Sequence, residues 1–187
     1  MGGLIRPADE LQVVRINLRS VHKSDYLRRL EEEGNAPLIV SPLAELYMSM
    51  ELSGKSDYLE NKDLDHNLGK TSFTMISTLG LALCTVVPTD SSTGATITEA
   101  SYTGYARKKI EAATLNAAAS GSTASNAAYE FANCTAGSAT VIGWAALDGT
   151  TIGAGNIHYW GTATSTVIST TQTPPTISSG GFVVNED

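Results

Sequence analysis

The segment from residue 79 to residue 84, with the sequence LGLALC, constrains the fold most, because bulky and small side chains alternate along it. Successive side chains of a β-strand point to opposite faces, so the pattern predicts a strand with one bulky and one small face. The small face indicates that a second sheet or another subunit approaches this strand closely.

Short apolar runs separated by turn residues recur through the rest of the chain. Alternation predicts a strand at 141–147, with Ile142, Trp144 and Ala146 on one face, and another at 156–161, with His158 and Trp160 on one face. Asp148 and Gly149 form a strong hairpin-turn signal between these two strands. The further strands that we predict lie at 102–107, 129–131, 167–168, 177 and 182–184. Many short strands with frequent turns predict a mainly β fold, an antiparallel β-sandwich or jelly-roll-like domain.

A short helix is predicted at residues 57–68, ahead of the strands. Asp57, followed by Glu60 three residues later, is typical of a helix start, and Gly69 is a suitable residue just beyond its end. We therefore place the β domain at residues 56–187, led by this helix.

Residues 1–55, the N-terminal arm, have a different pattern of short amphipathic helices separated by breaks. One helix is predicted from Asp9 to about Leu18, a second over 24–33, and a third from Pro42 to Met50. The apolar positions that need a partner surface are Leu11, Val14, Leu18, Leu43, Leu46 and Tyr47. Such short segments rarely fold alone. The arm therefore either packs on its own β domain or docks on another protein.

Charge argues against several classes of binding protein. The formal net charge is −7, and all 12 lysines and arginines lie at or before Lys109, whereas binding to nucleic acid needs a basic face.

The run from Phe73 to Val87 is too short to span a bilayer, and the first residues lack the pattern of a signal peptide. We expect assembly in a cytosol, with Cys84 and Cys134 as reduced core residues.

The sequence motifs that would indicate nucleotide binding, metal binding or catalysis are incomplete. The GKS and GKT triplets at 54–56 and 69–71 each lack the earlier glycine of a phosphate-binding loop, and 63–74 lacks two positions of a calcium loop. No cysteine cluster suggests zinc, and the three histidines form no catalytic set. We expect no enzyme activity, no metal and no cofactor.

Two groups of residues remain as candidate sites. Trp144, His158 and Trp160 form either a buried sheet face or an interface, and a carbohydrate-contacting aromatic patch of His158 with Trp144 is a third alternative. Arg107 is expected in an ion pair, either within the chain or between subunits.

The order of motifs resembles a family of bacteriophage proteins. The residues that carry the likeness are DYLEN at 57–61, DH at 65–66, GKT at 69–71, LALCT at 81–85, PTD at 88–90, Glu99 and YTGYAR at 102–107. Later pieces from 143 to 184 fit as well. Over about 56–187 the chain resembles virion structural proteins of tailed bacteriophages, described as tail fibre or capsid decoration proteins.

This resemblance implies a non-enzymatic virion protein that is assembled in the host cytoplasm. The first expectation from it is a capsid decoration, or cement, protein that binds the major capsid protein and stabilises the head. The alternative is a tail fibre or baseplate module that contacts tail proteins and the host. In either position we expect a homo-oligomer, with a trimer favoured by symmetry.

Overall fold

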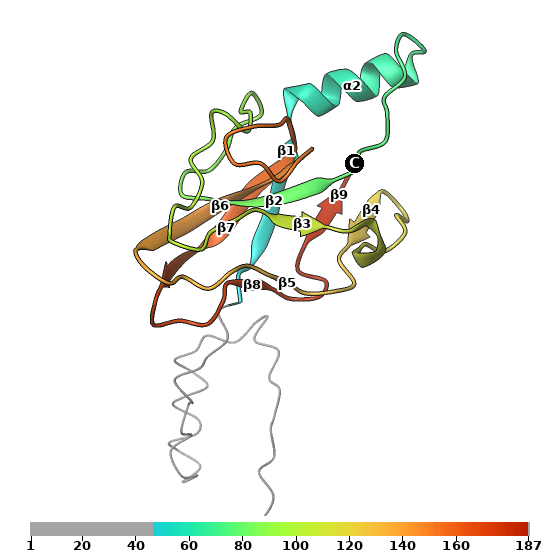
Figure 1. Ribbon diagram of the computed structural model, residues 1–187. Helices are drawn as coiled ribbons and strands as arrows, with labels where there is room; N and C mark the ends of the chain where they lie inside the picture. The colour runs from blue at the N-terminus through green and yellow to red at the C-terminus, as the bar shows by residue number, and fades with distance from the viewer. Residues whose placement is uncertain (1–46, 187) are drawn as a thin grey trace, which may run out of the picture. The chain divides into compact units, whose positions relative to one another are not determined.

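The computed structural model describes residues 47–186, and these form a mainly β fold with antiparallel sheets (Figure 1). The main sheet has five strands in the order β1-β7-β6-β2-β3, and two smaller sheets pair β4 with β9 and β5 with β8. The elements are β1 Met50–Lys55, α2 Asp57–Asn67, β2 Leu79–Cys84, β3 Lys108–Ile110, η1 Ala112–Thr114, β4 Ser122–Ala124, β5 Tyr129–Glu130, β6 Ser138–Leu147, β7 Ile157–Ser169, β8 Thr176–Ile177 and β9 Val183–Asn185. The predicted mainly β class is confirmed.

The first described residues belong to the β domain. Strand β1 pairs antiparallel with β7, from Met50 opposite Ala163 to Lys55 opposite Tyr159. Met48 is buried in the core, and its backbone N–H donates to the carbonyl oxygen of Thr176. The helix predicted through Met50 is therefore wrong over 47–50, and 50–55, which we had assigned to the arm, form an edge strand of the sheet. The remaining arm residues, 1–46, lie outside the described part of the chain.

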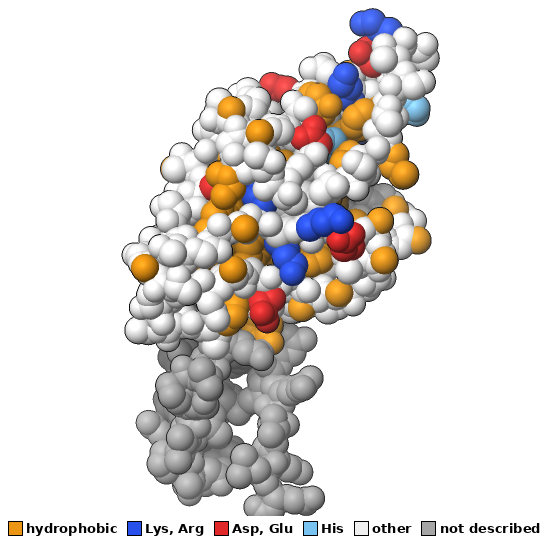
Figure 2. Space-filling view, in the orientation of Figure 1, with side chains coloured by type: hydrophobic (Ala, Val, Ile, Leu, Met, Phe, Trp, Pro, Cys, Tyr) orange, Lys and Arg blue, Asp and Glu red, His pale blue; other side chains and the backbone are white. Residues whose placement is uncertain are grey.

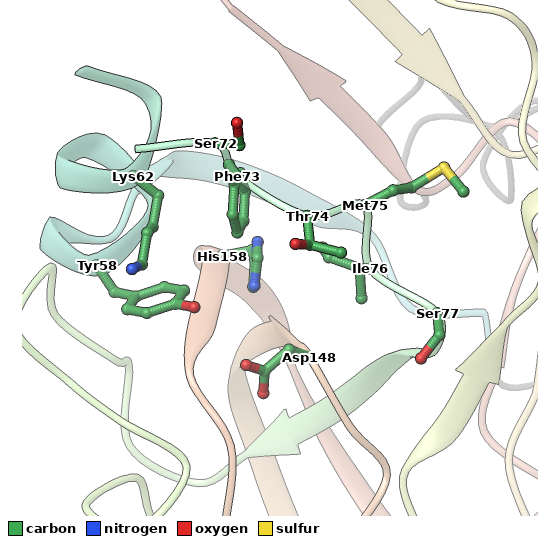
Figure 3. Close-up of a pocket in the computed structure, with 10 residues that line it drawn as sticks. All are labelled: Tyr58, Lys62, Ser72, Phe73, Thr74, Met75, Ile76, Ser77, Asp148 and His158. Atoms are coloured by element: carbon green, nitrogen blue, oxygen red, sulfur yellow. The ribbon is translucent and has the colours of Figure 1, made fainter. Parts of the chain in front are cut away.

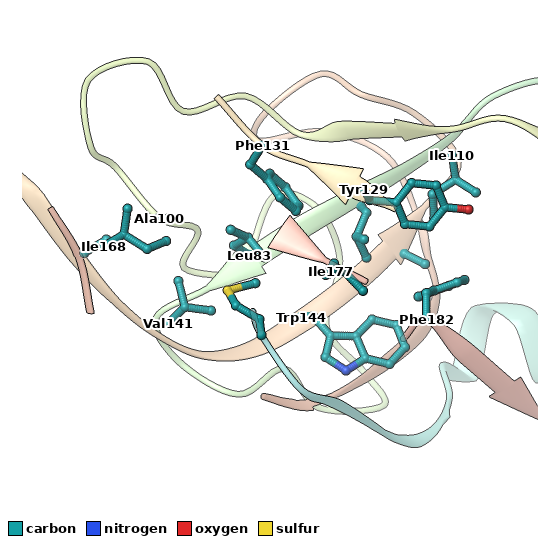
Figure 4. Packing of buried hydrophobic residues seen from close by; sticks show 14 of the residues in the cluster. Leu83, Ala100, Ile110, Tyr129, Phe131, Val141, Trp144, Ile168, Ile177 and Phe182 are labelled. Atoms are coloured by element: carbon teal, nitrogen blue, oxygen red, sulfur yellow. The ribbon is translucent and has the colours of Figure 1, made fainter. Parts of the chain in front are cut away.

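The two faces of the main sheet bury different kinds of side chain. The bulky face of β2 joins the larger core, which is closed by aromatic residues from β5, β6 and the C-terminal segment (Figure 4). Its members include Leu81, Leu83, Ala100, Tyr129, Phe131, Val141, Trp144, Ile168, Ile177 and Phe182. The small face joins a second cluster of Ala82, Cys84, Ala145, Leu147 and Ile157. The predicted division of β2 into a bulky and a small face is confirmed.

Loops of the same chain cover the small face, and this corrects the expected second sheet or subunit. A side chain at Gly80 would clash with the carbonyl oxygen of Gly149, and one at Gly143 would lie 2.9 Å from the α-carbon of Val87. Ile97, from the polar loop after β2, packs against the second cluster. The small residues of β2 and β6 therefore make room for the chain's own loops.

Two irregularities in the long β6–β7 hairpin alter the predicted faces. The register shifts between Val141 and Gly143, so Val141 joins Trp144 in the larger core instead of facing away from it. A second shift at the other end leaves Leu147 opposite Ile157 and Ala146 opposite Tyr159, with His158 between them. An extra residue in a strand reverses the alternation beyond it. Strict alternation therefore predicted the wrong face for Ile142 and separated Val141 from the core.

Two further predictions differ from the structure. Residues 102–107 form an irregular segment with an isolated bridge from Thr103 to Ala136 and with Gly104 at a φ of +103°, and only the next three residues form β3. The connection at Asp148 is a longer loop, in which the Asp148 carboxylate accepts hydrogen bonds from the backbone N–H of Asn156 at 2.8 Å and its side-chain amide at 2.8 Å. The sequence predicted a tight turn at this point. The structure instead has a longer loop, and the side chain of Asp148 joins its two ends.

Helix α2 begins and ends as its flanking residues indicate. Ser56 caps the start, because its side-chain oxygen accepts a hydrogen bond from the backbone N–H of Leu59, and the Asp57 start predicted from sequence is displaced by one residue. At the other end Gly69, with φ +73°, and Lys70 donate backbone hydrogen bonds to His66 and Asp65. These are the two bonds of a Schellman motif, so the predicted glycine stop is confirmed.

Candidate functional site

Arg107 lies inside the molecule in an ion pair with Glu99. Its Nη2 atom is 2.7 Å from Oε1 of Glu99, and the two side chains are 0% and 6% exposed. The Nη1 atom donates to the carbonyl oxygens of Gly149 and Ala154, at 3.2 and 2.8 Å. Arg107 thereby holds together two loops that cover the small face of the sheet, and the pair lies within this chain.

Tyr105 completes the surroundings of Glu99. Its hydroxyl donates to Oε2 of Glu99 at 2.8 Å and accepts from the backbone N–H of Leu83 at 3.1 Å. Burial, followed by the neighbouring Glu99 charge, raises the pKa of Tyr105 well above its usual range. The hydroxyl therefore stays protonated and serves as a fixed donor to the carboxylate.

The two tryptophans hold the edge strand β1, and the buried Trp144 offers no open binding surface. Trp144 is 1% exposed, and its indole N–H donates to the carbonyl oxygen of Glu51 at 3.1 Å. Trp160 belongs to the other cluster and donates in the same way to Lys55 at 3.1 Å. Trp144, His158 and Trp160 therefore do not form one patch, and the burial of Trp144 excludes a sugar platform built on it.

His158 occupies a different place, between α2 and the end of the main sheet. Its ring lies 5.9 Å from the ring of Phe73 in a stacked arrangement and 5.6 Å from the ring of Tyr58 in an edge arrangement. Figure 3 shows it with Tyr58 and Lys62 of the helix on one side and the segment 72–77 on the other. The bulge in β7 is what directs this side chain toward the helix.

The imidazole of His158 is buried with one hydrogen-bonding atom unsatisfied. The residue is 2% exposed, and its Nε2 atom has no hydrogen-bond partner within the described residues. Burial lowers the pKa of His158, although the charges of Asp148 and Asp63 oppose this effect. The ring is therefore neutral near pH 7, and its unpaired nitrogen carries a desolvation cost that a partner would remove.

A surface pocket of about 370 Å³ opens beside this ring. Its walls are Tyr58, Lys62, Ser72, Phe73, Thr74, Met75, Ile76, Ser77, Asp148 and His158 (Figure 3). Sequence reasoning singled out only His158 among these as a candidate. The others come from a helix, an irregular segment and a distant loop, and no periodicity or motif joins them.

A second polar cluster lies on the other side of α2. Lys55 pairs with Asp63 at 2.6 Å and with Glu186 at 3.0 Å, and the Tyr159 hydroxyl donates to Glu186 at 2.6 Å. The bond from Tyr159, followed by the bond from Lys55, lowers the pKa of Glu186. This cluster joins β1, α2 and β7 to Glu186, the residue that follows β9, and we interpret it as structural.

Other classes of site have no support in the described residues. No group of histidine, cysteine, aspartate or glutamate in 47–186 could hold a metal ion, and both cysteines are free and buried. Among the described helices none is long and apolar enough to cross a membrane. On the face shown in Figure 2, acidic and basic side chains are scattered over the described part and form no basic patch. Of the candidate arm residues only Tyr47 is described, and it is exposed.

The comparisons with known proteins identify the class. Residues 54–185 match the family model described as Podophage GP4 fiber I protein gp80, so the match covers most of the chain. A search of curated proteins found no match. The chain belongs to this podophage fibre family, and it is a bacteriophage virion structural protein. The resemblance seen in the sequence is confirmed.

Proposed function

We propose that this chain is a non-enzymatic structural component of the tail fibre. The observation that carries the proposal is the family match over 54–185, whose description names a fibre. This favours the tail over the capsid decoration role that the sequence resemblance put first, although both are virion roles. The alternative position within the tail is a baseplate module.

The ion pairs of the described residues support a structural role. Within 47–186, Arg107 pairs with Glu99 and Lys55 pairs with Asp63, and each ion pair joins different elements of the fold. The ion-pair partners fix the positions of these side chains. Among these residues no nucleophile lies next to a general base, which is the arrangement that covalent catalysis needs. We therefore propose that the domain acts by binding and by position in the particle.

Immunogold electron microscopy of purified virions tests the location. Antibodies raised against residues 47–187 should label the tail appendages. The matched control is an antibody against the major capsid protein, which should label the head of the same particles. Label over the whole head surface with the first antibody would instead support capsid decoration.

We also propose that the chain forms a homo-oligomer, with a trimer favoured, and that the N-terminal arm docks on a neighbouring virion protein. The apolar positions of its short amphipathic segments need a partner surface, and display in several copies would strengthen the attachment. The residues proposed for this contact are Leu11, Val14, Leu18, Leu43, Leu46 and Tyr47.

Replacing Leu43 and Leu46 with Asp tests the docking of the arm, and Tyr47 is left unchanged because it bridges to Thr176 of the β domain. The variant should fail to co-sediment with particles that lack the protein, while the melting temperature of the β domain stays nearly unchanged. Light scattering on the same samples gives the oligomeric state. A variant that still binds but melts several degrees lower would show that these residues pack on their own domain.

A further inference from the structure

Helix α2 presents apolar side chains that stay exposed among the described residues. Its residue Leu59 is buried, whereas Leu64 is 58% exposed and Leu68, just beyond the end of the helix, is 80% exposed. The two exposed leucines are four residues apart, so they are neighbours on one side of the helix. Figure 1 shows the C-terminal end of α2 pointing away from the main sheet. Apolar side chains grouped on a projecting helix are typical of a protein–protein contact.

A hollow of about 440 Å³ lies beside Leu64, between α2 and the C-terminal segment. Three carboxylates line it, those of Glu60, Asp63 and Glu186, together with one ammonium group, that of Lys55. Lys55 is already paired with Asp63 and Glu186, and no ion pair within 47–186 includes Glu60. The hollow therefore has an excess of negative charge next to an apolar wall. We call the two exposed leucines and this hollow the α2 face.

The N-terminal arm contains a segment of matching chemistry. Residues 11–23 include three basic residues, Arg15, Arg19 and Lys23, and no acidic residue, whereas 47–187 contain 6 basic and 12 acidic residues. The three basic residues follow one another at a spacing of four, which places them along one side of a helix. The apolar positions of the same segment are those already noted in the sequence, Leu11, Val14 and Leu18. The segment is thus complementary to the α2 face in charge and in apolar character.

We propose that the α2 face binds residues 11–23 of a neighbouring copy of this chain. The inference rests on the proposed homo-oligomer and arm docking, and it names a second copy as the virion protein that this part of the arm contacts. The apolar positions of 11–23 cover Leu64 and Leu68, and an arginine of the segment pairs with the carboxylate of Glu60.

The direction of β1 favours a neighbouring copy over the chain's own arm. Met50 lies opposite Ala163 and Lys55 lies opposite Tyr159, directly before α2, so the described chain begins at the end of β1 that is remote from the α2 face. Residues 24–46 can span at most roughly 80 Å, which is enough to reach an adjacent subunit. A contact from the arm of one copy to the α2 face of the next is head-to-tail, and such contacts close a ring of copies.

Photo-crosslinking in the full chain tests this contact. A benzophenone side chain replaces that of Leu64, and ¹⁴N-labelled and ¹⁵N-labelled chains are mixed in urea, refolded together and irradiated. Mass spectrometry should find crosslinks from position 64 to peptides of 11–23, including crosslinks that join a ¹⁴N chain to a ¹⁵N chain. Crosslinks to 11–23 that never join the two labels would overturn the proposal, because the arm would then fold back on its own domain. Crosslinks to other segments alone, or none, would also overturn it.

Light scattering on the same samples separates failure of this inference from failure of the proposed function. An oligomer without the crosslink would refute only the contact at the α2 face. A monomer would refute the homo-oligomer as well.

Charge reversal provides a second test with a matched control. Arg15→Glu combined with Arg19→Glu should reduce the crosslink several-fold, and Glu60→Arg added to this pair should restore part of it. Arg28→Glu combined with Arg29→Glu makes the same charge change in the arm outside 11–23, and it should leave the crosslink unchanged. Equal losses in the two double variants, or no loss in either, would contradict the proposal.

Discussion

Arg107 and Glu99 form an ion pair inside the molecule, with Nη2 2.7 Å from Oε1 and almost no exposure of either side chain. The same guanidinium also donates to backbone carbonyls of the loop after β6. A pair of this kind is costly to break, because the remaining charge stays buried without compensation.

Replacing Arg107 with Met should therefore lower the free energy of unfolding by about 3–5 kcal/mol. Urea denaturation followed by circular dichroism measures the change. The matched control is Lys109→Met, which breaks an exposed pair with Glu111 at 2.9 Å. The control should change stability by less than about 1 kcal/mol. Equal effects of the two substitutions would contradict the structural role of Arg107.

Gly80→Ala tests the close contact between β2 and the loop after β6. A methyl group at this position would meet the carbonyl oxygen of Gly149, and backbone gives way less easily than a flexible side chain. We expect a loss of about 1–3 kcal/mol, as for other overpacked sites. Gly54→Ala is the control, because nothing lies within 4 Å of a methyl group there. A stable Gly80→Ala variant would show that the loop does not rest on this strand.

Two truncated chains test whether β1 belongs to the domain. The fragment 47–187 retains β1 together with the hydrogen bonds that it accepts from Trp144 and Trp160. It should unfold cooperatively. The fragment 56–187, which the sequence alone suggested as complete, leaves both indole N–H groups without these partners. Its melting temperature should be lower by several degrees. Equal melting temperatures for the two fragments would contradict the assignment of β1 to the sheet.

The stability of the protein should depend on pH through His158. Burial lowers its pKa in the folded state, so the unfolded chain binds a proton first as pH falls through the usual histidine pKa of about 6.5. Stability contributed by the neutral ring is present above that pH and declines below it. Melting temperatures measured between about pH 7.5 and 5.5 should fall less for His158→Phe than for the unmodified protein. Parallel curves for the two proteins would refute this role.

The sequence predicted the parts of the fold that depend on local pattern. The alternating side chains of β2 and the glycine that ends α2 are in place, because each depends only on neighbouring residues. The bulge at His158 and the long loop after Asp148 were missed, because contacts between distant segments decide both. Strand β1 was missed for the same reason, since only its pairing with β7 and its hydrogen bonds with the two tryptophans make 50–55 part of the sheet.

Prediction of the candidate site from the sequence was limited in the same way. His158 was recognised, but it was grouped with Trp160 by counting along the strand, and the bulge at His158 changes this count. Phe73 and Tyr58 contact the imidazole from the irregular segment after α2 and from the helix itself. No spacing in the sequence joins these three residues, and only the folded chain brings them together.

The copy number of this chain in the virion tests the proposed role most directly. Purified particles are digested, and peptides from 47–187 are quantified against isotope-labelled standards together with peptides of the major capsid protein. A tail fibre occupies few symmetric positions, so we predict about a few tens of copies per particle or fewer. A value of roughly hundreds of copies, in fixed proportion to the major capsid protein, would contradict the fibre assignment and support capsid decoration.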